Sequence, residues 1–213
     1  KLREEGDYDD VSVAGPGFIN IRISDAALLG AVERSPEKTM TGKKVVTEYS
    51  DPNPFKVLHA GHLYTTLIGD VISRLIDTAG GDVHRVNFGG DVGLHVAKNM
   101  WAIIRTLGAE SPERLTAVGD DPHARAAWLS ARYVEGNAAY EEDEQSKAEI
   151  IDVNKRVYQV HADDDHTSGF AQVYWTCREW SYEYFKVLYD ELKVVPFEKY
   201  YPESATTPTG IAT

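Results

Sequence analysis

The fold is decided by residues 48–62, which read Glu-Tyr-Ser-Asp-Pro-Asn-Pro-Phe-Lys-Val-Leu-His-Ala-Gly-His. A β-branched segment predicts a short strand over 45–50, and an amphipathic pattern predicts a long helix from His59 to the Gly80-Gly81 pair. The prolines between them exclude both a helix and a central strand, so this stretch is the loop that joins strand to helix. Loops of this kind are where α/β sheets bind ligands.

The same order of elements recurs downstream. A second strand is predicted over 83–88, a Gly89-Gly90 turn follows, and a second helix is predicted from about Asp91 to Leu107. Strands and helices in alternation predict an α/β fold with a parallel sheet and right-handed crossovers.

Beyond residue 108 the chain is predicted to be mostly helical. A strongly acidic helical stretch covers 137–165, and an aromatic-rich helix covers 170–192. A strand over 194–201 is expected to return to the sheet, where Pro196 indicates an edge or a strand start. Breaks between helices are expected at Pro112, Gly119, Pro122 and Gly136.

The first forty residues have a separate character. A Gly-Pro-Gly turn precedes an alternation over 18–24 that places Ile19, Ile21 and Ile23 on one face, which predicts a strand with one buried face. A short helix is expected over 25–32, with Ser24 or Asp25 as its N-cap. The polar segment 34–43 is the best domain boundary, which divides the chain into 1–40 and 41–213.

Composition excludes several classes of protein. The chain has 213 residues, a net charge of -12 and one cysteine, Cys177, so it is neither a disulfide scaffold nor a zinc ribbon. It contains no long apolar run and no signal peptide, which predicts a soluble, cytoplasmic protein without a membrane partner or a structural metal. The negative net charge argues against nucleic-acid binding through overall electrostatic attraction, but it does not exclude a local nucleotide site. The chain begins without Met and stops abruptly, which suggests a piece of a longer protein.

The two histidines in the opening stretch indicate a phosphate site. His59 and His62 are three residues apart at a helix start, so they share one face beside free backbone N–H groups that stabilise anions. Ala60 and Gly61 between them leave the backbone open to a flat base. Imidazole donors and the Lys56 ammonium suit a triphosphate whose α-phosphate is attacked. Histidine pairs at helix starts can also serve only as caps.

The surroundings make the pattern more specific. Residues 50–70 look like the signature region of arginyl-tRNA synthetases, class I enzymes in which a Ser-x-Pro-Asn turn and a Lys precede an HxGH signature. Residues 86–93 resemble the next strand and its Gly-Asp-x-Gly turn, and residues 200–204 resemble the strand and Glu-Ser pair after the inserted helices. Residues 11–24 are similar to the end of the family's N-terminal tRNA-contacting domain. Four residues differ from those usual in the family and indicate a divergent subgroup: Asp51, Val57, Tyr64 and Val92.

This resemblance implies a fold and an activity. The fold would be a Rossmann-type, HUP-like class I catalytic core with a helical insertion at about 108–193, preceded by the tail of a small α+β N-terminal domain. The activity would be ATP-dependent activation of L-arginine to arginyl-adenylate, with Mg²⁺ accompanying ATP, and transfer to the 3′ end of tRNA(Arg) by a monomer. No Lys-Met-Ser-Lys-like loop, Tyr-x-x-Arg-Asp-like segment or anticodon-binding domain precedes Thr213, so the chain alone is expected to be inactive.

The resemblance also assigns residues. Glu48 would pair with the arginine guanidinium, and Asn53, with Ser50 beside it, would position the polar main-chain end of the substrate. His59 and His62 would bind ATP and act in catalysis. Three neighbouring residues complete the ATP site: Ala60, Gly61 under the adenine, and Lys56, which would also act in catalysis by supplying charge to the phosphates.

Other residues have both a structural and a functional interpretation. Asp91 is expected mainly to cap the second helix, and His95 to be a satisfied surface histidine, although both could face the site. Asp70 could be a helix-surface charge or a site residue. The acidic and histidine cluster at 161–166 favours helix capping over metal binding. Cys177 is expected to be buried, and the aromatic set Tyr174, Trp175, Trp180 and Tyr184 is expected to be core rather than an RNA-stacking surface.

Two rival functions stay open. Another HxGH enzyme, either a synthetase for a different amino acid or a nucleotidylyltransferase, would share the ATP chemistry. A non-catalytic synthetase-like module could instead bind RNA or a protein through the acidic helices.

Overall fold

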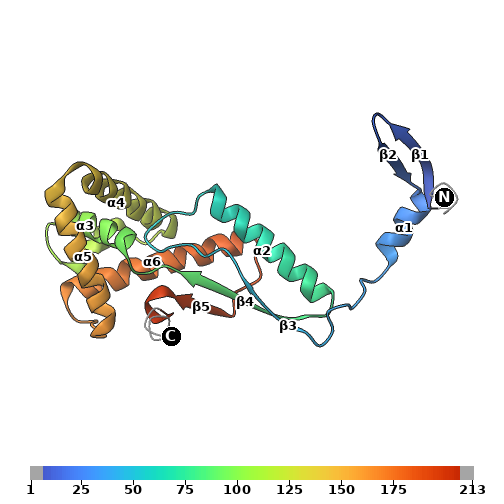
Figure 1. The fold of residues 1–213 in the computed structure, drawn as a ribbon. Coiled ribbons are helices and arrows are strands. Elements are labelled where there is room, and N and C mark those ends of the chain that lie inside the picture. The colour runs from blue at the N-terminus through green and yellow to red at the C-terminus, as the bar shows by residue number, and fades with distance from the viewer. Residues whose placement is uncertain (1–6, 207–213) are drawn as a thin grey trace.

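The amino-terminal part of the computed structural model, which describes residues 7–206, is a small hairpin followed by a helix. Strands β1 (Tyr8–Ala14) and β2 (Phe18–Ile23) pair antiparallel across the Gly-Pro-Gly turn. Helix α1 (Asp25–Glu33) begins where Ser24 accepts a hydrogen bond from the Ala27 amide, as predicted. Figure 1 shows these elements well apart from the other helices and strands, at the end of an extended segment.

The buried face predicted for β2 is wrong. Every residue of this strand is exposed, and Ile19 and Ile23 are each 54% exposed. The alternation is present, but within residues 7–206 only its hairpin partner β1 makes extensive contact with β2.

A parallel sheet forms the centre of the molecule and confirms the predicted α/β class. Its strands are β3 (Lys44–Glu48), β4 (Asp82–Gly89) and β5 (Lys199–Pro202), in the order β3-β4-β5. β5 is shorter than the predicted strand because the segment before it bonds elsewhere. The Val194 amide donates to the Tyr189 carbonyl at the end of a helix, and the Val195 amide donates to the Asp70 carboxylate.

The crossover helices follow the predicted order. Helix α2 (Ala60–Thr78) has His59 as its N-cap, and α3 (Leu94–Leu107) follows β4. The start of α3 differs from the prediction, because its N-cap is Gly93, with φ of 94°, and not Asp91. Asp91 lies before the helix with its carboxylate turned into a buried network described below.

The helical insertion contains η2 (Pro112–Val118), α4 (Pro122–Glu142), α5 (Glu144–Ala162) and α6 (Gly169–Glu191). The break predicted at Gly136 is wrong, because α4 runs through it. A Cβ atom there would lie 2.6 Å from the carbonyl carbon of Lys98, so this glycine lets α4 pack directly against α3. The acidic stretch divides instead at Asp143, whose carboxylate caps α5 by accepting from the Ser146 amide.

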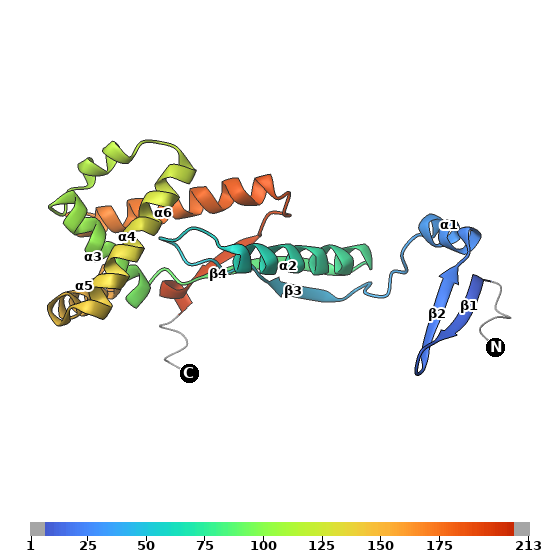
Figure 2. The ribbon, with the colours of Figure 1, turned by 90° about the horizontal axis from the view of Figure 1, so that it is seen from above.

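The main core lies between these helices. Figures 1 and 2 show α3, α4 and α5 gathered at one end of the sheet, with α6 running back along it. Tyr174 and Cys177 are fully buried and Trp180 nearly so, while Tyr184 joins a second cluster beside Tyr49, which confirms the core interpretation of these residues. Trp175, the remaining member of the predicted aromatic set, is only partly buried and packs against the edge of the core. None of the helices within residues 7–206 is both long and apolar enough to cross a membrane.

Candidate active site

A cleft opens at the carboxyl end of β3, beside the amino-terminal half of α2. It has a volume of about 660 Å³ and brings together five of the predicted site residues: Glu48, Ser50, His59, Gly61 and His62. The remaining wall is largely apolar and comes mostly from α2, with Tyr49 and Asp51 contributed by the segment that follows β3. The cleft is therefore at the strand-to-helix loop, where the sequence pattern predicts the ligand site.

The two histidines form a reciprocal cap on α2. The Nδ1 atom of His59 accepts hydrogen bonds from the amides of Gly61 (3.1 Å) and His62 (3.4 Å), and the Nδ1 atom of His62 accepts from the His59 amide (3.3 Å). Their rings stack with centroids 3.8 Å apart. A Cβ atom at Gly61 would come within 2.8 Å of the His59 ring, so a side chain at this position would displace that ring from its capping position.

This cap fixes what each imidazole can offer a ligand. Since both Nδ1 atoms accept, the proton of each neutral ring is on Nε2, which leaves an N–H donor on each ring. The pKa of His62 is lowered, first by burial and then by the neighbouring charges of His59 and Lys56. The capping and functional interpretations are therefore compatible, because one nitrogen caps the helix and the other is free to donate.

The loop before α2 has an unusual backbone. Ser50, Asp51 and Phe55 all adopt positive φ, at 76°, 47° and 68°, a region that costs a non-glycine residue on the order of 1 kcal/mol or more. Residues distant in the sequence hold it there. The Ser50 hydroxyl is hydrogen-bonded to those of Tyr189 and Thr66, both at 2.7 Å.

Both backbone polar groups of Phe55 are hydrogen-bonded to distant side chains. Its amide donates to the Ser181 hydroxyl (2.8 Å), and its carbonyl accepts from the Asn99 side-chain amide (2.6 Å). Its ring is completely buried. Ser181 and Tyr189 both belong to α6, so this helix of the insertion holds the loop through hydrogen bonds to Phe55 and Ser50.

Two carboxylates give the mouth of the cleft negative charge. Glu48 is exposed at the end of β3, and Asp51 follows in the loop, where its carboxylate accepts from the Phe88 amide at 2.8 Å. Burial raises the pKa of Asp51, this hydrogen bond opposes the rise, and the nearby charge of Glu48 adds to it. Such a pair suits a cationic group on a ligand.

Asn53 and His95 meet at the turn after β4. The Asn53 side-chain oxygen accepts from the Gly90 amide (3.1 Å), and the Gly90 carbonyl accepts from Nε2 of His95 (2.9 Å). His95 is thus partly buried rather than a surface residue, and burial lowers its pKa. These contacts join the loop before α2 to the turn before α3.

Asp91 is completely buried in a network that sequence patterns did not reveal. Its carboxylate accepts from Arg178 Nε (3.0 Å) and from both the amide (2.9 Å) and the hydroxyl (2.8 Å) of Ser204. Tyr174 donates to its carbonyl. Asp91 therefore fastens the turn after β4 to α6 and to the end of β5. Asp70 is likewise buried, and it binds the Val195 amide and Arg74, so it has a structural role.

Lys56 does not line the cleft wall. Its ammonium lies 3.9 Å from the centre of the Tyr133 ring, on α4. Sequence reasoning missed Tyr133, Ser181, Tyr189, Asn99 and Arg178, because their partners are distant in the chain and no local pattern marks them.

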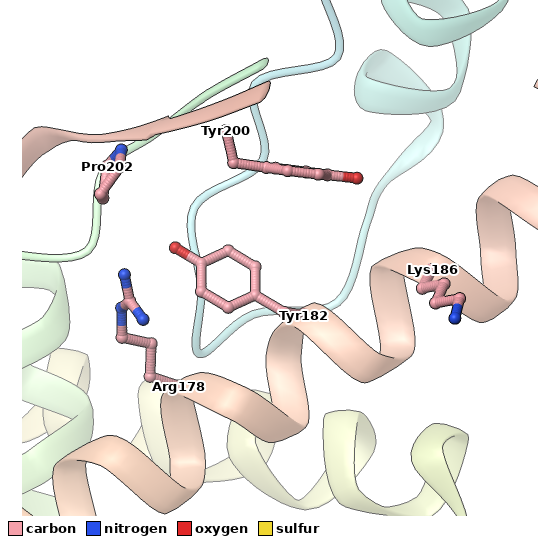
Figure 3. Close-up of a pocket in the computed structure, with 5 residues that line it drawn as sticks. All are labelled: Arg178, Tyr182, Lys186, Tyr200 and Pro202. Atoms are coloured by element: carbon pink, nitrogen blue, oxygen red, sulfur yellow. The ribbon is translucent and has the colours of Figure 1, made fainter. Parts of the chain in front are cut away.

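Two other features lie outside this cleft. A cavity of about 470 Å³ between α6 and β5 is lined by Arg178, Tyr182, Lys186, Tyr200 and Pro202, and it shares no lining residue with the cleft (Figure 3). The cluster at 161–166 lies where α5 ends, with Asp163 as the C-cap. Asp165 accepts from the Thr167 and Ser168 amides in the turn before α6, and the Ser168 hydroxyl caps α6 by accepting from the Ala171 amide. Within residues 7–206, no group of three or more His, Cys, Asp or Glu side chains is arranged to hold a metal ion.

The sequence matches a protein-family model and several curated proteins. A family model described as tRNA synthetases class I (R), catalytic domain, matches residues 25–208. The arginine–tRNA ligase of Bdellovibrio bacteriovorus is 30% identical over 200 residues, which cover 90% of this chain and 32% of that protein. The cytoplasmic arginine–tRNA ligase of Xenopus tropicalis is 32% identical over 198 residues, covering 87% of this chain and 27% of that protein.

Solved structures share the fold. The arginyl-tRNA synthetase of Thermus thermophilus matches with a TM-score of 0.62 and 22% identity, over 96% of this chain and 31% of that one. That of Plasmodium falciparum matches with a TM-score of 0.55 and 22% identity, over 98% of this chain and 35% of that one. The chain therefore spans about a third of the length of the relatives it matches.

Proposed function

The chain belongs to the catalytic-domain family of the class I tRNA synthetases for arginine, and from this premise we propose that the complete protein activates L-arginine with ATP and transfers it to the 3′ end of tRNA(Arg). The observation that carries this proposal is the paired-histidine cap at the mouth of the cleft, with Glu48 at the end of the adjoining strand.

ATP is proposed to bind at the start of α2. Anions are stabilised at a helix N-terminus, and the Nε2–H groups of His59 and His62 add donors there. These donors would stabilise the charge that develops on the α-phosphate and on the departing pyrophosphate, with Lys56 contributing a positive charge nearby. Ala60 and Gly61 would lie under the adenine. Mg²⁺ would enter with the phosphates, held by their oxygens.

L-arginine is proposed to bind through its two charged ends. The Glu48 carboxylate would accept the planar guanidinium with two hydrogen bonds, and Asp51 would add negative potential. Asn53 would position the main-chain end of the substrate, since its oxygen is already held by Gly90 and its amide nitrogen is the group left to donate. The Ser50 hydroxyl is engaged by Tyr189 and Thr66, so its contribution would be to set the loop.

We further propose how the complete protein is divided into domains and where it acts. Residues 1–40 would be the tail of an N-terminal tRNA-contacting domain, and residues 41–213 part of the catalytic domain with its insertion at 108–193. The complete protein would act as a monomer. It would work in the cytoplasm, the location that the name of the Xenopus relative gives for that protein.

The test is ATP–pyrophosphate exchange by the complete protein, measured with each of several amino acids and with and without tRNA(Arg). Exchange that depends on arginine supports the proposal. Exchange that depends on a different amino acid would point to another synthetase with the same signature. Absence of exchange in the presence of tRNA, together with retained RNA binding, would favour a non-catalytic module.

A further inference from the structure

The aromatic ring under Lys56 has no role in the assignments above. Tyr133 lies on α4, within the helical insertion, and its ring centre is 3.9 Å from the Lys56 ammonium. A cation this close to a tyrosine face is attracted by the quadrupole of the ring, whose face carries a negative electrostatic potential, and this attraction is effective out to about 6 Å. Lys56 is itself half-buried, so part of its usual hydration is replaced by this contact.

Both partners are fixed by the same side chain. The Asn99 amide nitrogen donates to the carbonyl of Phe55, which directly precedes Lys56, and to the carbonyl of Leu129, one turn before Tyr133 on α4. Phe55 is further held by Ser181. The backbone segments that carry Lys56 and Tyr133 are therefore held close to each other by Asn99, which brings the two side chains together.

The charge of Lys56 acts on two nearby histidines, His62 and His95. It is one of the causes that lower the pKa of His62, after burial and His59, and it also lowers that of His95, after burial. The ammonium is thus close enough to the start of α2 to act on an anion there. A carboxylate partner would cancel much of this charge, whereas an aromatic face holds the cation and leaves its charge available.

We propose that Tyr133 is a positioning residue, which holds the Lys56 ammonium beside the signature histidines so that it faces the phosphates of ATP. This inference rests on the proposed function for its ligand. It gives the helical insertion a part in the chemistry of the site, through a contact that no sequence spacing indicates.

The experiment compares Tyr133→Phe, Tyr133→Leu and Lys56→Met in the complete protein by arginine-dependent ATP–pyrophosphate exchange. Tyr133→Phe keeps the aromatic face and should stay within about twofold of the wild type. Tyr133→Leu keeps apolar bulk without the ring, and kcat/KM for ATP should fall by about threefold to thirtyfold, while KM for arginine is unchanged. In the Lys56→Met background, Tyr133→Leu should have no further effect, because the cation it holds is gone.

Equal activity of Tyr133→Phe and Tyr133→Leu would overturn the inference. So would a loss of activity from Tyr133→Leu that is as large in the Lys56→Met background as in the wild type. A second readout separates this outcome from failure of the proposed function. Imidazole titration by NMR should show a higher His62 pKa in Lys56→Met and in Tyr133→Leu, and an unchanged one in Tyr133→Phe. If the wild type shows no exchange at all, the proposed function fails, and an unchanged His62 pKa in Tyr133→Leu then also overturns the positioning contact.

Discussion

Replacement of Gly136 by alanine should destabilise the protein, although alanine is the better helix former. Gly136 lies inside α4, where the change alone would favour the helix by about 1 kcal/mol. The new Cβ atom, however, would be 2.6 Å from the carbonyl carbon of Lys98 and closer still to its oxygen, against an ordinary contact of 3.4–4 Å. Because the obstacle is backbone, α3 and α4 would have to separate by about 1 Å.

The expected size of the effect follows from these opposing contributions. Overpacking in a core costs about 1–3 kcal/mol and more when no flexible side chain can yield, so the net loss should be about 1–2 kcal/mol. For a chain of this length, this loss corresponds to a melting temperature lower by about 2–8 °C. Thermal unfolding followed by circular dichroism at the helical wavelengths measures it.

The matched control is Gly30→Ala in α1. This glycine is also helical, and a Cβ atom there would meet nothing within 4 Å, so the same substitution should leave the melting temperature unchanged or slightly raised. A Gly136→Ala protein as stable as the control would refute the packing argument. Since α4 also carries Tyr133, the displaced helix should weaken exchange activity in the same direction as Tyr133→Leu.

Three further predictions concern the cleft and the neighbouring turn after β4. His59→Ala or His62→Ala should strongly lower adenylate formation in the complete protein while the far-UV circular dichroism is retained, and normal pyrophosphate exchange in both variants would contradict their role. Glu48→Gln should raise KM for arginine more than KM for ATP, and an equal rise in both would count against guanidinium pairing. His95→Gln keeps a donor for the Gly90 carbonyl and removes a buried group whose pKa is lowered. The free energy of unfolding of the wild type should fall as the pH drops below about 6.5, because the unfolded chain takes up a proton that buried His95 resists, and urea titrations should show a shallower fall in the variant.

Elements that depend on neighbouring residues could be predicted from the sequence. The helix beginning at His59, the strand ending at Glu48 and the Ser24 cap of α1 each follow from residues within one or two turns. The grouping of Glu48 with the two histidines also follows, because strand end and helix start adjoin the same loop.

Residues whose partners are distant could not be placed in this way. Asp91 looks like a helix cap until Arg178 and Ser204 are brought to it. Gly136 looks like a break until the backbone of α3 lies against it, which shows how tertiary packing overrides a local preference. In the hairpin the error is of the opposite kind, since the alternation of β2 is present and no packing partner accompanies it in the described residues.

The distribution of charge explains how an acidic insertion can serve an ATP site. The side chains that α4 and α6 direct at the signature loop are uncharged: the Tyr133 ring, the Ser181 hydroxyl and the Tyr189 hydroxyl. Two acidic residues of the insertion are engaged elsewhere: Asp143 caps α5, and Asp165 accepts backbone hydrogen bonds in the turn before α6. Aromatic faces and hydroxyls can therefore fix the loop and its lysine without opposing a triphosphate, so the net charge of -12 does not describe the local field at the start of α2.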